Sequence, residues 1–151
     1  MLAPFEPSII YSSTEPKAVE TACIAADLLT VPSKSAVGLE EHARDSVPWL
    51  NEESFQEKVR ELFKQPDALI LGEETAAESL HRFEKTVDDL VVAHPGESIA
   101  LVSHGTVITL FVCSLNVIDP FEFWKTLTMP CLVLVRVPTM AFERIIDLDS
   151  A

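Results

Sequence analysis

The sequence is poor in positive charge. It contains 11 lysines and arginines against 24 aspartates and glutamates, which gives the 151-residue chain a formal net charge of −13. Nucleic acids and anionic membrane surfaces are bound by clustered basic residues, so this shortage argues against both as partners. A phosphate or a small phosphorylated ligand needs only a few basic groups that converge locally. The charge balance therefore excludes polyanions and is compatible with a small anionic ligand.

Cysteine and long apolar runs are scarce as well. The three cysteines, Cys23, Cys113 and Cys131, show no metal-ligand spacing, and their odd number argues against a disulfide framework. All three lie among apolar neighbours, so we expect buried, reduced thiols. The longest apolar stretch, residues 107–117, is too short and too polar to cross a bilayer, and the first ten residues lack the basic segment of a signal peptide. We therefore expect a cytoplasmic protein.

The order of apolar patterns predicts an α/β fold. Nearly half of the residues are apolar (48%), enough for one domain over residues 1–151 to bury a core. Short β-prone runs alternate with helical spacing, which favours a three-layer α/β/α arrangement around a mostly parallel sheet. We expect strands at Ile9–Tyr11, Ile99–Ser103, Cys131–Val137 and Phe142–Ile146, helices over Lys17–Leu29, Phe55–Phe63, Thr75–Val91 (opened by the capping box Thr75-Ala-Ala-Glu78) and Thr106–Leu115, a connection at Asp119-Pro120, and a long loop over Val31–Asn51.

The tripeptide Ser103-His104-Gly105 is the most informative local feature. It follows the apolar run Ile99-Ala-Leu-Val102 and precedes a helical pattern, which places an imidazole at a strand's carboxyl end beside the first free N–H groups of a helix. Ligands bind at this edge of open α/β sheets, and a helix N-terminus favours anions, phosphate above all. A purely structural histidine at the strand end is the alternative. The other three histidines share no ligand spacing with His104, so we expect no metal site, and no cofactor is indicated.

Three segments together resemble one family. They are Tyr11-Ser-Ser-Thr-Glu-Pro-Lys-Ala-Val-Glu-Thr-Ala22, Leu39-Glu-Glu41 with Trp49 downstream, and Glu97-Ser-Ile-Ala-Leu-Val-Ser-His-Gly-Thr-Val-Ile108. Their order and content are similar to the histidine phosphatase superfamily, which includes the phosphoglycerate mutases. The segment Asp119-Pro-Phe-Glu-Phe-Trp124 and the final strands also fit in order and spacing.

The resemblance implies roles for individual residues. His104 would hydrogen-bond a bound phosphoryl group, and Glu41 would protonate the leaving oxygen. Ser12, Lys17 and Gly105 would complete the phosphate site. At the position of the family's arginine stands Lys17 or, one residue earlier, Pro16, so the planar fork of an arginine is missing. From the residues alone, Glu41 could equally be a solvated loop carboxylate and Lys17 an exposed lysine at a helix start.

One family motif is missing. The strand ending in Arg-His-Gly, whose histidine is the nucleophile, occurs nowhere in residues 1–151. We therefore expect a chain shortened at its N-terminus relative to the family, without the first strand and helix, which retains part of a phosphate pocket but has little or no activity (a pseudoenzyme). Two alternatives are a fragment of a longer, active phosphatase and a non-catalytic interaction module. A serine hydrolase is disfavoured because no Gly-x-Ser-x-Gly elbow is present.

The missing strand also has a structural consequence. In the family it lies beside the strand that carries Ile99–Ser103, and unpaired buried backbone groups are costly. We expect Met1–Ile10 to cover part of the gap, or a second copy of the chain to pair there and form a homodimer.

Overall fold

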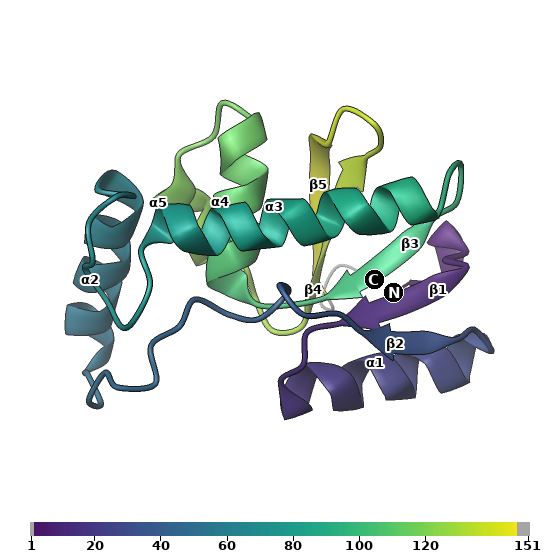
Figure 1. The fold of residues 1–151 in the computed structure, drawn as a ribbon, viewed down its shortest axis with the longest axis horizontal. Coiled ribbons are helices and arrows are strands. Elements are labelled where there is room, and N and C mark those ends of the chain that lie inside the picture. Colours follow the sequence, from purple (N-terminus) through teal and green to yellow (C-terminus); the bar gives the residue numbers. More distant parts are fainter. Residues whose placement is uncertain (1, 148–151) are drawn as a thin grey trace.

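The computed structural model describes residues 2–147, and its centre is a parallel sheet of three strands. The strands are β1 (Ile9–Ser12), β2 (Ser33–Ser35) and β3 (Ile99–Val102), in the order β2-β1-β3 (Figure 1). Strand β1 runs parallel to both neighbours, with Tyr11 opposite Lys34 in β2 and Leu101 in β3. The carboxyl ends of β1 and β3 therefore lie next to each other.

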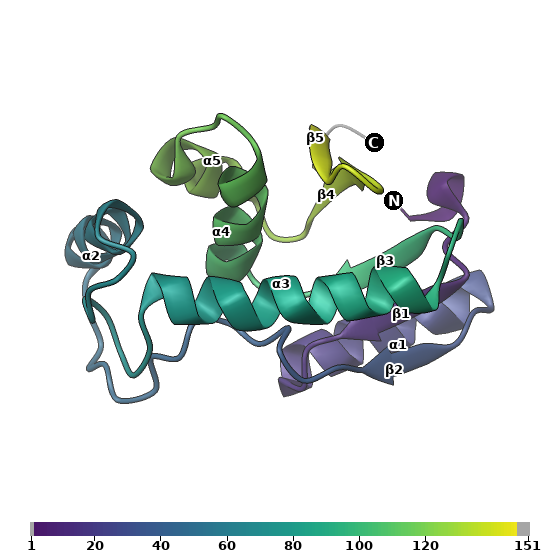
Figure 2. The same cartoon turned by 45° about the horizontal axis from the view of Figure 1, so that its top comes forward.

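Helices cover both faces of this sheet. Ile10 and Ala100 face helix α1 (Pro16–Leu29) and pack against its buried alanines Ala22 and Ala26. The alternate residues of the same strands, with Ile9 and Tyr11 buried, pack on the opposite face against α3 (Ala76–Ala93) and α4 (Gly105–Leu115). Figure 2 shows α1 and α3 on the two sides of the strands. The predicted three-layer α/β/α fold with a parallel sheet is confirmed.

The remaining elements extend the second layer. Helix α2 (Glu52–Lys64) lies at one end of the molecule, beyond the N-terminus of α3, and contacts α5 (Pro120–Thr126) (Figure 1). Strands β4 (Cys131–Arg136) and β5 (Ala141–Asp147) form a separate antiparallel sheet whose side chains, Val133 and Phe142 among them, pack on the main core. A short connection between two strands permits only antiparallel pairing, so these strands form their own hairpin. The first ten residues contain a 3₁₀ turn, η1 (Ala3–Phe5).

Three local predictions were wrong. The loop expected over Val31–Asn51 contains β2, whose sequence Ser-Lys-Ser has no apolar alternation because it is an edge strand. Asp119-Pro120 opens α5, where the Asp119 side chain accepts the amide of Glu122. The three cysteines are not buried as expected: Cys23 is exposed, because it lies off the face of α1 that carries the buried Ala22 and Ala26, and Cys113 and Cys131 are half-buried.

Strand β3 has a free edge within the described residues. Its only partner there is β1, and the Ser13 amide donates to the Val102 carbonyl oxygen at 2.9 Å. Because backbone groups alternate along a strand, those of Leu101 point to the other side. Residues 2–8 form η1 and lead into β1, and Leu2 packs on the cluster that contains Ala100 and Val102 of β3. Cover of this edge by the first ten residues and pairing with a second copy both stay predictions.

Candidate functional site

His104 lies where β3 ends and α4 begins, as the sequence predicted. Its side chain is buried, and its Nε2 is 2.7 Å from the Ser13 Oγ and 3.1 Å from the Glu15 Oε1. Ser13 follows β1 directly, so the parallel pairing of β1 and β3 brings the two side chains together. Which of Ser13 and His104 donates depends on the imidazole tautomer, and the Glu15 carboxylate forms an ion pair with the ring when the ring is protonated.

Glu15 places a negative charge directly at this imidazole. Its Oε1 also accepts the amide of Glu41 at 2.8 Å, and its Oε2 is 3.2 Å from the Lys17 Nζ. Burial alone would raise the pKa of Glu15, but the Glu41 amide, the His104 imidazole and the Lys17 ammonium outweigh it and lower that pKa. An ionised carboxylate therefore lies directly beside the His104 imidazole.

The Glu41 carboxylate lies at the N-terminus of α4. It accepts the amides of Thr106 and Val107, both at 3.3 Å, and the Thr106 hydroxyl at 3.2 Å. The two amides are backbone donors of the first helical turn that have no partner within the helix, and the helix dipole also favours an anion there. The side chain is 15% exposed. Glu41 is therefore not a solvated loop carboxylate, and its role as a proton donor stays a prediction.

Arg44 brings a positive charge to the start of α4. Its Nη1 donates to the Thr106 hydroxyl oxygen at 3.2 Å, and its Nη2 lies 3.4 Å from the Glu41 Oε2. The guanidinium stands over the ring of Phe55, 5.2 Å from the centroid, and the side chain is 28% exposed. Arg44 thus offers a planar fork of donors at the site, whereas the 69% exposed Lys17 offers a solvated point charge.

The imidazole of His104 is held neutral. Burial lowers its pKa below the ordinary 6.5. The carboxylates of Glu15 and Glu41 raise this pKa, but their effect is smaller than that of burial. The positive charges of Lys17 and Arg44 lower it further. The lowered pKa favours the neutral ring at pH 7.

The structure brings some of the predicted residues together and separates others. Glu41 and the α4 start at Gly105 lie beside His104, but Ser12 does not contact it. The Ser12 Oγ is 3.2 Å from the Ser35 Oγ and lines a small cavity of about 120 Å³ between α1 and β2. Gly105 is not required by crowding, since an added Cβ would be 3.7 Å from the Trp124 Nε1. The roles of Ser12, Lys17 and Gly105 as phosphate ligands stay predictions.

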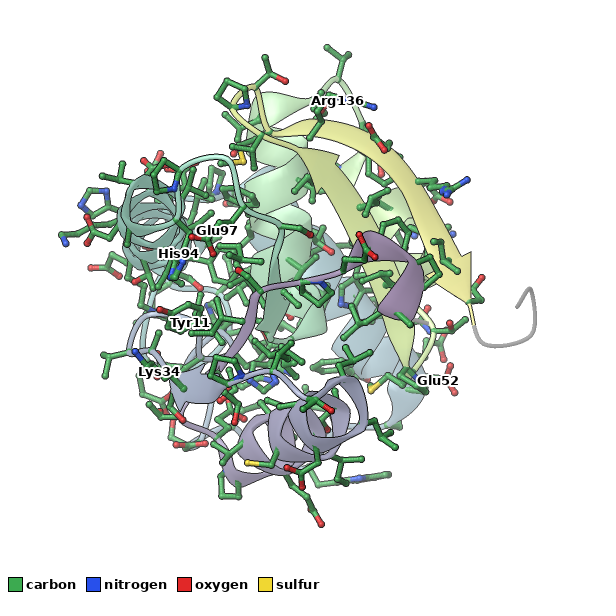
Figure 3. The ribbon with its side chains drawn as sticks, turned by 90° about the vertical axis from the view of Figure 1, so that its right-hand side faces the viewer. Tyr11, Lys34, Glu52, His94, Glu97 and Arg136 are labelled. Carbon is green, nitrogen blue, oxygen red and sulfur yellow. The ribbon has the colours of Figure 1, made fainter. Side chains whose placement is uncertain are left out.

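The other histidines occupy unrelated positions. His42 is buried, and its Nε2 donates to the Glu74 carbonyl oxygen at 2.8 Å, while its Nδ1 has no hydrogen-bond partner among the described residues. His81 is exposed on α3. His94 ends α3 between Tyr11 and Glu97, with its Nε2 3.0 Å from the Tyr11 hydroxyl (Figure 3).

No group of three or more potential metal ligands occurs within residues 2–147. Within the same range, no helix has the length and apolar content needed to span a membrane.

Acid is expected to destabilise the protein as the pH falls through 6.5, the ordinary pKa of histidine. Burial lowers the pKa of both His42 and His104 below 6.5, so the unfolded chain takes up protons first as the pH falls. The free energy of unfolding then drops by about 1.4 kcal/mol for each unit by which a folded-state pKa is depressed. Urea denaturation at several pH values should show a shallower loss for His42→Gln than for wild type. The variant His81→Gln serves as the control. An unchanged pH dependence in His42→Gln would contradict the assignment.

The fold and the site together define a three-layer α/β protein with a buried histidine at the start of a helix. The family profile "Histidine phosphatase superfamily (branch 1)" matches residues 1–139, and the chain therefore belongs to the histidine phosphatase superfamily. The resemblance seen in the sequence is confirmed. No curated protein matches the chain.

Several solved structures share the fold. YhfR of Bacillus stearothermophilus is 20% identical, with a TM-score of 0.66 over 99% of this chain and 76% of that one. A mycobacterial glucosyl-3-phosphoglycerate phosphatase complexed with VO3 is 17% identical, with a TM-score of 0.67 over 95% and 77%. "Mycobacterial hydrolase 1" is 18% identical, with a TM-score of 0.64 over 82% of this chain. The chain spans 65% of the length of that structure, 58% of "Mycobacterial hydrolase 2" and 66% of the mycobacterial glucosyl-3-phosphoglycerate phosphatase in complex with inorganic phosphate.

Four of the site residues were missed by the sequence reasoning. Ser13 could have been found, because successive side chains of a strand point to opposite faces of the sheet and Ser12 lies on the face that α1 covers. Glu15 and Arg44 carry no signal of their own in the sequence, and Thr106 is an ordinary residue of a helical first turn. The position of Arg44 depends on the loop that carries Glu41, and this loop has no periodic pattern.

Proposed function

We propose that this chain binds phosphate or a small phosphomonoester at the site around His104 and hydrolyses it slowly or not at all. The observation that carries the proposal is the buried imidazole at the end of β3, with Nε2 facing the end of β1, in a member of the histidine phosphatase superfamily. The mycobacterial phosphatase of the same fold has been crystallised with inorganic phosphate and with VO3, which supports a tetrahedral or vanadate-type anion as the ligand.

The donors for such an anion are present but held by carboxylates. Glu15 occupies the His104 Nε2, and Glu41 occupies the amides of Thr106 and Val107. A phosphate would replace these contacts, and Arg44 would supply bidentate donors to its oxygens. Because the ligand competes with two internal anions, we expect binding in the millimolar range.

Slow turnover follows from the placement of the histidines. Covalent phosphoryl transfer needs a nucleophile in line with the leaving oxygen. His42 is buried against Glu74, His81 is exposed on α3 and His94 is bonded to Tyr11, so these three histidines do not face His104. If residues 1–151 are part of a longer protein, a histidine from outside them could complete the site.

We also propose a cytoplasmic location for this protein, which its three free thiols support.

Calorimetric titration with inorganic phosphate tests the proposal. We expect wild type to bind with a Kd of about 1 mM and His104→Ala to bind at least about tenfold more weakly, because the ring supplies the buried donor. His81→Ala should behave as wild type. Absence of binding to wild type, or equal binding to His104→Ala, would contradict the proposal. Hydrolysis of an aryl phosphate that survives in His104→Ala would contradict the mechanism.

The free edge of β3 favours a second candidate, a non-catalytic module that pairs strands with another chain. Within residues 2–147 the outer backbone groups of this strand have no sheet partner, and such an edge is a template for a further strand. Wild-type protein that binds no phosphate but sediments as a dimer would replace the first proposal by this one.

A further inference from the structure

Arg82 reaches from α3 to the loop that carries Glu41. Its Nη1 donates to the carbonyl oxygens of Gly38 at 3.1 Å and Glu40 at 2.8 Å, and its Nη2 donates to that of Glu41 at 2.7 Å. One guanidinium therefore holds three backbone oxygens within four residues of the loop. The side chain is 27% exposed, so its positive charge interacts mainly with other groups of the protein and little with solvent.

Glu74 fixes the guanidinium and the other side of the loop. Its carboxylate accepts from the Arg82 Nη2 at 2.6 Å and from the Arg82 Nε at 3.1 Å, a bidentate pair. The same carboxylate accepts the amide of Ala43 at 2.7 Å, and the Glu74 carbonyl oxygen accepts from His42. The pair Arg82–Glu74 thus grips the chain immediately before and immediately after the Glu41 side chain.

The loop is shaped to meet this pair. Gly38 has a φ of +103°, and a Cβ there would lie 2.0 Å from the Thr86 Oγ1 and 3.1 Å from the Arg82 carbonyl oxygen, so only glycine permits this approach to α3. Ser103, next to His104, donates to the carbonyl oxygen of Leu39 at 2.7 Å. The loop position is therefore set between α3 and the residues around His104.

We propose that Arg82, clamped by Glu74, is a positioning residue that determines where the Glu41 carboxylate lies relative to His104. Arg82 does not touch the site itself, and it acts through the backbone of residues 38–41. The fork geometry is essential, because a lysine has one nitrogen and cannot hold the oxygens of Gly38, Glu40 and Glu41 together with Glu74. The consequence for phosphoryl chemistry rests on the proposed function, but the placement of Glu41 does not.

The test compares Arg82→Lys with Lys85→Gln, which removes an exposed positive charge from the same helix. Thr106 and Val107 donate to Glu41, so their amide resonances follow the charge of its carboxylate in an NMR pH titration. We expect Arg82→Lys to reduce the titration amplitude of both amides by roughly half or more, while the amide of Ile10 in the core remains unchanged. Lys85→Gln should titrate as wild type. Glu41→Gln gives the reference in which the titrating group is absent.

Each outcome decides the matter. Folded Arg82→Lys with wild-type titration of Thr106 and Val107 would overturn the proposal. If Arg82→Lys does not fold, Glu74→Gln is measured and judged by the same criterion. In aryl phosphate hydrolysis, Arg82→Lys should lower kcat without raising KM and should have no further effect in Glu41→Gln. A wild type that neither binds nor hydrolyses a phosphate contradicts the proposed function and leaves the amide titration as the test of positioning.

Discussion

Replacing Glu15 by glutamine is expected to tighten phosphate binding about tenfold. The Glu15 carboxylate is 3.1 Å from the His104 Nε2, and so a phosphate that uses this nitrogen must displace or face a unit negative charge. At a separation of about 4 Å such a repulsion costs roughly 1 kcal/mol in water and more in a partly buried site. A tenfold change in affinity corresponds to about 1.4 kcal/mol.

The glutamine keeps the shape of the site. Its side-chain oxygen can still accept the amide of Glu41, which Glu15 now accepts at 2.8 Å, so the loop stays in place. Glu20→Gln removes the same charge from the exposed surface of α1 and is the matched control. Phosphate titration of the three proteins at one ionic strength measures the effect. Equal or weaker binding by Glu15→Gln would show that phosphate does not bind at His104.

Arg44 is expected to matter more than Lys17 for holding the ligand. Arg44→Gln should weaken phosphate binding about tenfold or more, because a partly buried guanidinium makes charge-assisted bonds to two oxygens at once. Lys17→Gln should weaken it less than about threefold, because the ammonium is 69% exposed, is screened by solvent and already faces Glu15.

The two variants are matched in charge, so the same titration compares them directly. Thermal unfolding of Arg44→Gln checks that the contact with Phe55 is not needed for folding. A larger loss for Lys17→Gln than for Arg44→Gln would contradict the site geometry and favour the residue that the family resemblance places there.

Local physics was sufficient to predict most of the fold. The capping box at Thr75 forms as predicted, with the Thr75 side chain accepting the Glu78 amide at 3.1 Å, and the apolar spacing gave α1, α2, α3 and α4. Strand β2 could not be found in this way, because an edge strand of Ser-Lys-Ser buries too little to leave a pattern. Asp119 and Pro120 are typical both of a connection and of a helix start, and in the structure they open α5.

The site was only partly accessible to sequence reasoning. His104 could be placed because a strand end and a helix start are both visible in the pattern around it. The groups around it come from Glu15 at the start of α1 and from Arg44 in the loop that carries Glu41, and Arg82 holds this loop from α3. Charged residues that meet only in the tertiary structure leave no trace in the spacing of residues along the sequence. The sequence therefore predicted a cation of the site at Lys17 and not at Arg44.

An NMR titration of the wild-type protein with inorganic phosphate tests the central claim most directly. The account predicts that the His104 ring resonances and the amides of Ser13, Thr106 and Val107 shift together and saturate with one Kd. Saturable shifts confined to Ser12, Cys23 and Ser35 around the small cavity, or no shifts at His104, would contradict it.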